Sequence, residues 1–366
     1  MTSAMTSTDR LASGMHRRVI FREFGDLGNL QLEEAPNPDP GPTEVLVRVR
    51  AAAVNHLDLD MLRGISRYQV TTPHTLGMEA AGTVEATGSQ VTGVRLGERV
   101  MVACDIVCRK CEYCLLGHDN LCQYAYRPGW THPGAYAELM IAPARGLYPL
   151  PDSISFEAAA ALQIGLGTAW HMLITRGRIH AGEWVLINGA AGSIGLAAVQ
   201  LAKLAGARVI AASASTGKRM TLLADGADAA VDYTAESFVA DVRKITGGQG
   251  VDIVYEHVGG DLLPRSLDCL RAGGRLLTCG GHGGEISQFD IIPFFRRELT
   301  ILGSNSATQD DIRQVLDLVS SGRLQPVIAG RFPLESAADA LAMLDQRLNY
   351  GRVLILPDTD ARTPCG

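Results

Sequence analysis

Apolar and polar positions alternate in the first part of the chain. Val45, Val47 and Val49 stand at every second position, which is the period of a β-strand. Short apolar runs separated by glycines continue to about residue 149, a pattern typical of a compact β-barrel or sandwich. Prolines interrupt the chain just before the first strong strand, at Pro36, Pro38, Pro40 and Pro42. We therefore predict a β-rich domain over residues 18–155.

The pattern changes after about residue 155, where short apolar runs alternate with longer segments of helical period. The predicted strands are residues 184–188, 208–212, 251–255 and 275–278. The predicted helices between them are residues 194–205, 238–245 and 262–270. Strands that alternate with helices indicate βαβ units and a parallel sheet covered on both faces. The fold class is therefore α/β, with a doubly wound parallel sheet over residues 156–305.

Both ends of the chain are predicted to differ from this β/α segment. Helices are expected at 310–320 and 337–348, and a closing strand at 352–356. We expect residues 306–366 to return to the first domain, so that the β/α segment is inserted within it. Residues 1–17 are rich in Ser, Thr and Ala and lack the apolar core of a secretory signal. They are predicted to be a disordered leader.

Length and composition narrow the class of protein. A chain of 366 residues is too long for one typical core and suggests two domains. Hydrophobic residues make up 46% and charged residues 20%, as in average soluble globular proteins. The net charge of −6 argues against a nucleic-acid partner, and no run approaches the roughly 18 apolar residues of a membrane span. We expect a cytoplasmic protein that acts on a small molecule.

The cysteines are clustered. Five of the eight fall within residues 104–122, and such clustering in a long chain without a signal favours metal ligation over disulfides. Four of them follow the spacing C-x2-C-x2-C-x7-C, which supplies the four thiolates of a closed tetrahedral zinc site: Cys108, Cys111, Cys114 and Cys122. An iron–sulfur cluster or four free thiols are the alternatives. We predict one structural zinc, with Cys104 as a spare thiol.

A glycine-rich turn lies between a predicted strand and a predicted helix. Glycines there allow a tight turn, close approach to a pyrophosphate and close helix–sheet packing, while the helix N-terminus supplies free N–H groups. With strands on both sides, this arrangement predicts a dinucleotide site. The candidate cofactor-binding residues are Gly189, Ala191, Gly192, Ser193, Ile194 and Gly195.

The end of the next strand indicates which dinucleotide is bound. An NAD site usually has a carboxylate there for the ribose 2′-hydroxyl, but residues 211–219 contain none. Ser213, Ser215 and Lys218 suit the 2′-phosphate of NADPH through charge-assisted hydrogen bonds. Alternatively, Lys218 and Arg219 only solvate the start of the following helix. We predict NADPH as the cofactor.

Several of these motifs together resemble the zinc-containing medium-chain dehydrogenase/reductase superfamily, which includes alcohol dehydrogenases and quinone reductases. The resemblance covers nearly all of residues 18–356. It implies a GroES-like catalytic domain, a Rossmann domain, an active site in the cleft between them, and a homodimer or homotetramer. The segments that resemble the family are Asn55-His56-Leu57-Asp58, residues 76–82, the four cysteines, residues 189–195 and Gly273-Gly274-Arg275.

The chain departs from the family where zinc alcohol dehydrogenases bind their catalytic zinc. By the resemblance, Asn55 stands in the position of a cysteine ligand and Met78 in that of a histidine ligand. The third position falls near Gln163 or Ile164. Asn, Met and Ile are not usual zinc ligands. The resemblance therefore implies that the structural zinc is kept and the catalytic zinc is lost.

The loss of a Lewis acid changes the expected chemistry. Without it, an alkoxide is hard to stabilise. Hydride addition to an enone or quinone places charge on a carbonyl oxygen that needs only hydrogen-bond donors. Family members without the catalytic zinc commonly reduce quinones, enones or enoyl thioesters with NADPH. We therefore expect an NADPH-dependent reductase of an activated C=C bond or a quinone. The alternatives are an alcohol or aldehyde dehydrogenase of the same superfamily and a non-catalytic NADPH-binding protein.

The candidate catalytic residues are Asn55, His56 and Asp58. Asn55 is the candidate hydrogen-bond donor to the substrate oxygen, or alternatively a cap for a helix over residues 58–63. His56 is a candidate for pyrophosphate contact or a proton relay, or else a packed histidine. Asp58 and Glu79 match positions that surround the family's metal ligands, and ion pairing is their alternative role. Tyr68 and His74 are candidates to reach a substrate.

Overall fold

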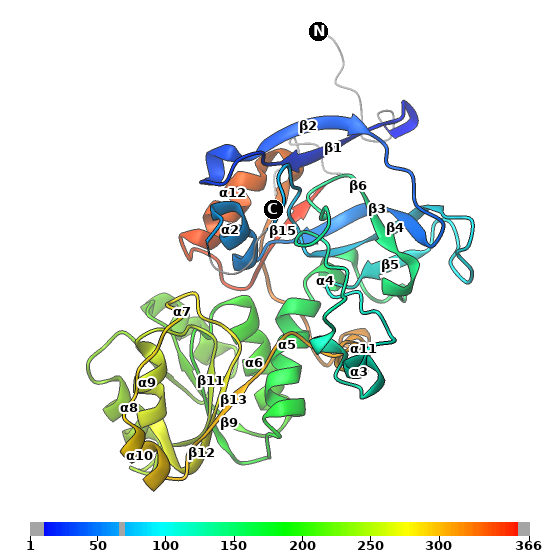
Figure 1. Cartoon of the computed structure of the whole chain (residues 1–366). Coiled ribbons are helices and arrows are strands. Elements are labelled where there is room, and N and C mark those ends of the chain that lie inside the picture. The colour runs from blue at the N-terminus through cyan, green and yellow to red at the C-terminus, as the bar shows by residue number, and fades with distance from the viewer. Residues whose placement is uncertain (1–10, 66–69, 358–366) are drawn as a thin grey trace. The chain divides into compact units, whose positions relative to one another are not determined.

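The computed structural model describes residues 11–65 and 70–357. These residues form two compact units (Figure 1). The first unit holds the described residues up to Gln163 and those from Ile328 onward, and the second holds Ile164–Val327. The second unit is thus inserted in the sequence of the first. Tyr68 lies outside the described residues.

The first unit is built on a largely antiparallel sheet. Its strand order is β14-β15-β3-β4-β5-β7, and β6 also pairs with β3. A separate two-stranded sheet joins β1 (Met15–Ile20) to β2 (Gln31–Pro36). The main strands are β3 (Glu44–Ala53), β4 (Glu79–Thr87), β5 (Arg99–Val102), β6 (Leu139–Pro143), β7 (Leu147–Pro149), β14 (Ile328–Pro333) and β15 (Arg352–Leu356). Helices of this unit include α2 (His56–Arg63), α4 (Phe156–Ala160) and α12 (Ala337–Asp345).

The alternation of apolar and polar residues in β3 corresponds to a strand with one buried face, as predicted. Val45, Val47 and Val49 are fully buried, whereas Arg48 and Arg50 are partly exposed. β3 also pairs with β4, β6 and β15, so it forms the centre of this sheet.

The second unit contains a six-stranded parallel sheet in the order β10-β9-β8-β11-β12-β13. Its strands are β8 (Trp184–Ile187), β9 (Arg208–Ala212), β10 (Ala229–Val231), β11 (Val251–Glu256), β12 (Leu270–Thr278) and β13 (Thr300–Gly303). Its helices include α6 (Ser193–Leu204), α7 (Thr216–Ala224), α8 (Phe238–Ile245), α9 (Leu262–Cys269), α10 (Ile291–Arg296) and α11 (Gln309–Ser320). Leu186, Ile210, Val254 and Leu276 are buried in its core. The predicted α/β class and doubly wound parallel sheet are confirmed.

The chain order of these strands creates a switch point. From β8 the chain runs outward through β9 to β10, and it then returns to the other side of β8 with β11. In open α/β sheets, ligands bind beyond the carboxyl ends of the strands at such a point. Here that point lies between β8 and β11.

The predicted disordered leader is wrong at its C-terminal end. Residues 1–10 lie outside the described residues, but Met15 and Arg17 belong to β1. This strand pairs with β2, and the Arg17 side chain and backbone N–H both bond the carboxylate of Glu138 at 2.9 and 2.7 Å. These partners lie well downstream in the chain, so the composition of the leader did not reveal them.

The boundaries of the compact units also differ from the predicted ones. They lie at 163/164 and 327/328, whereas 155/156 and 305/306 were predicted. Helix α4 packs on β3 and β4 of the first unit, although it follows residue 155. Helix α11 was expected to return to the first domain but belongs to the second unit. Its Asp311 accepts a hydrogen bond from Thr175 at 2.5 Å and lies 2.7 Å from His171 Nδ1. Only the part of the tail from β14 onward returns to the first unit.

Candidate functional site

The four predicted metal ligands come together in one cluster. The Sγ atoms of Cys108, Cys111, Cys114 and Cys122 all lie within 4.8 Å of one another. Three of the Sγ–Sγ distances are 3.5, 3.9 and 3.9 Å. A tetrahedron of sulfurs with zinc–sulfur bonds of about 2.3 Å has edges of about 3.8 Å. The four-cysteine cluster is therefore consistent with a structural zinc.

Backbone groups around the cluster also suit thiolate ligands. The N–H of Cys108 donates to Cys122 Sγ at 3.4 Å, and the N–H of Cys111 donates to Cys108 Sγ at 3.3 Å. Hydrogen bonding, with the Lys110 N–H first, lowers the pKa of Cys108, whereas desolvation raises the pKa of Cys114. A divalent cation would hold all four sulfurs as thiolates.

The glycine-rich turn has the conformation that its sequence requires. Gly189 has a φ of +60° and Gly192 is the N-cap residue of α6. A Cβ atom on Gly195 would lie 2.4 Å from the carbonyl oxygen of Gly189, so helix and turn can approach this closely only with glycine. The turn follows β8 directly and therefore lies at the switch point.

The same turn fits a phosphate-containing cofactor. A Cβ atom on Gly192 would lie 3.5 Å from the carbonyl oxygen of Gly189, an ordinary van der Waals distance, so this position of the turn is not crowded. Ser193 is the first residue of α6, and its Oγ is buried without a hydrogen-bond partner among the described residues. Buried hydroxyls usually have a partner. An uncrowded glycine, a buried hydroxyl and the N–H groups of a helix N-terminus together suit a pyrophosphate.

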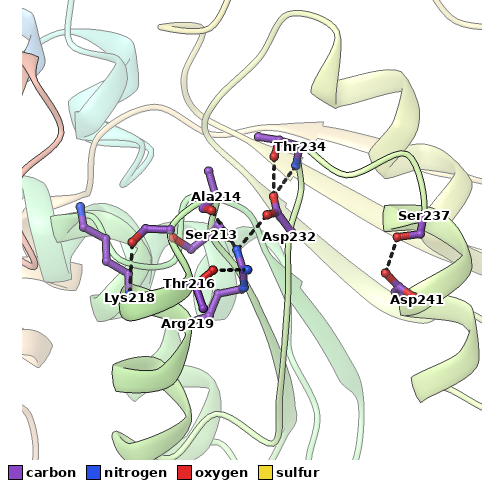
Figure 2. Close-up of polar contacts among 10 residues, drawn as sticks. Ser213, Ala214, Thr216, Lys218, Arg219, Asp232, Thr234, Ser237 and Asp241 are labelled. Carbon is purple, nitrogen blue, oxygen red and sulfur yellow. Dashed lines mark hydrogen bonds and ion pairs between the residues drawn. The ribbon is translucent and has the colours of Figure 1, made fainter.

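Figure 2 shows the loop after β9, where a 2′-phosphate is expected. Arg219 donates to the carbonyl oxygens of Ser213 and Ala214 at 2.7 and 2.9 Å, and pairs with Asp232 at 3.0 Å. The Lys218 side chain extends away from this cluster. Arg219 therefore shapes the loop, and Lys218 stays the cation that the sequence predicts for a phosphate.

The two serines of this loop differ in exposure. Ser213 is buried, whereas Ser215 is exposed. Ser215 caps α7, because its hydroxyl accepts a hydrogen bond from the N–H of Lys218 at 3.4 Å. Asp232, the carboxylate that pairs with Arg219, follows β10 rather than β9. Hydrogen bonds from Thr234 and the charge of Arg219 lower the pKa of Asp232.

Asn55 and Asp58 lie in a buried polar network in the first unit. The Asn55 amide nitrogen donates to the Ala53 carbonyl at 3.3 Å and to Glu79 at 3.2 Å. Its amide oxygen accepts a hydrogen bond from Arg352 at 2.8 Å. Both amide hydrogens of Asn55 thus have acceptors within the protein, and donation to a substrate would require one of these bonds to be exchanged. Asn55 is also the N-cap residue of α2, which begins at His56 rather than at Asp58 as predicted, and its backbone N–H bonds the Asp58 carboxylate at 2.8 Å.

Asp58 is fully buried in the same network. It accepts hydrogen bonds from the Asn55 N–H at 2.8 Å, the Tyr136 hydroxyl at 2.8 Å and the Gly77 N–H at 3.3 Å. Burial raises the pKa of Asp58 to about 6, although these bonds oppose the rise. Asp58 therefore fixes the start of α2 and the segment around Gly77.

Arg352 and Tyr136 were not among the predicted site residues. Arg352 forms an ion pair with Glu79, and both are almost completely buried. Burial lowers the pKa of Arg352 to about 10. The cluster thus contains the carboxyl groups of Asp58 and Glu79 but one guanidinium. Arg352 lies in the closing strand among apolar residues, and no local pattern connects it to Asn55.

Four further candidate residues belong to the same unit. His56 begins α2, is half-buried, and contributes to lowering the pKa of Asp345. His74 is buried, with Nε2 3.0 Å from the carbonyl oxygen of Gly129, and burial lowers its pKa. Met78 is buried. The side chain of Gln163 bonds the N–H of Cys104 and the carbonyl of Val102 at 3.0 and 2.7 Å.

Comparisons with known proteins agree with this architecture. An alcohol dehydrogenase GroES-like domain matches residues 41–152, and a zinc-binding dehydrogenase domain matches residues 193–321. A quinone oxidoreductase from Pseudomonas aeruginosa is 32% identical over 353 residues, covering 94% of this chain and 100% of that protein. An acryloyl-coenzyme A reductase from Sulfurisphaera tokodaii is 31% identical over 328 residues, covering 89% and 96%.

A solved structure is also similar over nearly the whole chain. The crystal structure of an NAD-dependent alcohol dehydrogenase has a TM-score of 0.88 and 37% identity, covering 93% of this chain and 99% of that one. In residues 11–65 and 70–357 no helix has the length and apolar character needed to cross a bilayer. Two matched domains and relatives that align over almost their full length establish that the chain belongs to the medium-chain dehydrogenase/reductase superfamily.

Proposed function

We propose that this protein is an NADPH-dependent reductase of an activated C=C bond or a quinone, and that it works without a catalytic zinc. The observation that carries the proposal is the Gly189–Gly195 turn at the switch point, followed by a β9 that ends without a carboxylate. Similarity to a quinone oxidoreductase and to an acryloyl-coenzyme A reductase supports the substrate class.

The proposal assigns the cofactor to residues of the second unit. The turn from Gly189 to Gly195 would bind the pyrophosphate through backbone N–H groups, and Ser193 would add its buried hydroxyl. Lys218 would attract the 2′-phosphate, assisted by the exposed hydroxyl of Ser215. The bound nicotinamide supplies the hydride. The four-cysteine cluster would bind one structural zinc.

The preference for NADPH is tested by replacing Lys218 with alanine. The loss of its positive charge is expected to raise the Kd for NADPH about tenfold and to leave the Kd for NADH nearly unchanged, because only NADPH has the 2′-phosphate. Titration of cofactor fluorescence measures both constants. Lys203→Ala is the matched control, since Lys203 pairs with Asp228 at 2.8 Å. Equal losses for both cofactors would contradict the assignment.

The absence of a catalytic zinc is proposed from the chemistry of the available donors. The positions that correspond to the family's catalytic zinc ligands are occupied by Asn55, Met78 and, if it is the third, Gln163. They offer two amides and a thioether, and both amides already bond protein groups. Zinc in proteins is bound by thiolate, imidazole and carboxylate groups. Zinc analysis gives about one ion per chain under this proposal and about two if a catalytic zinc is present.

Asn55 remains our candidate for stabilising the substrate oxygen. Loss of one such donor costs roughly two to three orders of magnitude in kcat in other enzymes. Asn55→Ala is therefore expected to lower kcat about a hundredfold, with little change in the Kd for NADPH. Steady-state kinetics and cofactor titration check the two halves of this expectation.

Asn55→Asp separates this role from capping. Aspartate caps a helix as well as asparagine does, but it places a negative charge beside Glu79 and where charge must develop on the substrate. We expect kcat to fall at least as far as with alanine. Wild-type activity of the Asp variant would reject Asn55 as the donor and leave it as a cap for α2.

An alcohol dehydrogenase is the second candidate, because a solved structure of that description is 37% identical. One experiment separates the candidates: NADPH oxidation with a panel of quinones, enones and enoyl thioesters, beside NADP⁺ and NAD⁺ reduction with a panel of alcohols. Turnover of alcohols alone would overturn the proposed reductase. Tight NADPH binding with no turnover in either panel would instead indicate a non-catalytic NADPH-binding protein.

A further inference from the structure

The loop that follows β11 is held in a fixed conformation by a buried carboxylate. Glu256 is the last residue of β11 and is fully buried. Its carboxylate accepts hydrogen bonds from the N–H groups of Val258 at 2.8 Å and of Gly259 at 3.0 Å. These two hydrogen bonds form a tight turn that includes His257. The position of His257 is therefore set by the loop.

The imidazole of His257 lies against the first glycine of the cofactor turn. A Cβ atom on Gly189 would be 3.1 Å from His257 Nε2 and 3.2 Å from Cε1. The ring also meets Tyr255 edge to face, with centroids 5.8 Å apart. Gly189 and His257 follow neighbouring strands, because β8 and β11 pair in parallel register. The Asn188 N–H extends this pairing to the Tyr255 carbonyl at 3.0 Å.

These two residues flank the switch point of the sheet. The turn begun by Gly189 leaves β8 on one side, and His257 leaves β11 on the other. A dinucleotide that binds at the switch point passes over both. Imidazole donates hydrogen bonds to phosphate or hydroxyl oxygens, and a protonated imidazole does so with charge assistance. A half-buried histidine at this place suits such an oxygen.

We propose that His257 is a cofactor-binding residue that donates a hydrogen bond to the ribose–pyrophosphate part shared by NADPH and NADH. This inference rests on the proposed function, and it adds a polar contact from β11 that the glycine turn does not provide. It differs from the role of Lys218, which concerns only the 2′-phosphate.

The test is direct titration of NADPH and NADH against the purified full chain and three variants. His257→Ala removes the donor, and His257→Phe keeps an aromatic ring against Gly189 and Tyr255 without a donor. Both are expected to raise the Kd of NADPH and of NADH by the same factor, about tenfold. His257→Gln provides an amide N–H in place of the imidazole N–H and is expected to recover part of this loss.

The controls separate binding from structure. His180 is exposed and precedes β8 at the opposite end of that strand, so His180→Ala is expected to leave both constants unchanged. Thermal unfolding of each variant shows whether the second unit is intact. If His257→Ala does not fold, the His257→Phe and His257→Gln variants still test the proposal.

The outcomes also distinguish the two proposals. A wild-type chain that binds neither cofactor would overturn the proposed function, and this inference with it. Wild-type binding together with a Phe variant that binds as tightly would overturn this inference alone, because His257 would then only fill space. A loss confined to NADPH would likewise overturn it, because the contact would then belong to the 2′-phosphate.

Discussion

Replacement of Arg352 by methionine is expected to lower the free energy of unfolding by about 3 to 5 kcal/mol, which is the usual cost of removing one partner of a buried ion pair. Arg352 is almost fully buried, pairs with Glu79 and donates to Asn55 at 2.8 Å. Methionine fills much of the same volume but leaves the Glu79 carboxylate buried without its cation. Urea denaturation measures the loss.

Two further variants show whether charge is the cause. Glu79→Gln in the Arg352→Met background removes the carboxylate left without its partner, so the double variant is expected to be more stable than Arg352→Met alone. Arg331→Met is the exposed control: Arg331 pairs with Glu157 at 2.7 Å and its side chain is 41% exposed. Exposed pairs contribute about 0–1 kcal/mol. A double variant no more stable than Arg352→Met would reject the charge explanation.

The loss caused by Arg352→Met is also expected to depend on pH. Burial raises the pKa of Asp58 to about 6, and the charge of Arg352 opposes that rise. A carboxyl group with a raised pKa in the folded state contributes stability at low pH that is lost as the pH rises through that pKa. Without Arg352 the pKa of Asp58 rises further. The destabilisation should therefore be larger at pH 8 than at pH 5.

Local sequence patterns predicted the regular elements well, because strand and helix periods depend on near neighbours. The strands at residues 208–212 and 352–356 were predicted with their observed bounds, and the helix predicted at 194–205 is Ser193–Leu204. The four cysteines were found by the same means, since their ligand spacing is short. The boundaries of the two compact units depend on contacts between distant residues, so they differ from the boundaries that local patterns predicted.

Features that depend on distant contacts were not predictable in this way. Arg352 is 297 positions from Asn55, and Tyr136 is 78 positions from Asp58. Single residues in an apolar strand or a loop give no periodic signal that would connect them. The sequence marked Asn55 as a hydrogen-bond donor, but only the structure shows that both amide hydrogens already have acceptors. Variants of several residues of this polar network are therefore needed to interpret the effect of a change at Asn55.

Replacement of Cys111 by serine is expected to reduce bound zinc from about one ion per chain to nearly none. It is also expected to lower the midpoint of thermal unfolding by roughly 5 to 10 °C, because part of the metal-binding free energy is folding free energy. The segment around the cysteines has little apolar packing, although hydrogen bonds such as those from Arg109 to the Arg145 carbonyl at 2.7 Å and from Arg145 to the Val107 carbonyl at 3.2 Å also hold it. Its small core consists of Val107, Ala125 and the cysteines themselves. Elemental analysis and calorimetry measure the two effects.

The exposed apolar side chains of residues 108–124 explain why loss of the metal is expected to lower thermal stability. Its two helical turns, α3 (Glu112–Leu115) and η2 (Asp119–Leu121), are short, and its large apolar side chains point outward: Leu115, Leu116 and Tyr124 are at least 64% exposed. Burial therefore contributes little to its order. Cys104→Ala is the control, because Cys104 is buried outside the cluster and should leave zinc content unchanged. If Cys111→Ser kept wild-type zinc and thermal stability, the four cysteines would not be a zinc site.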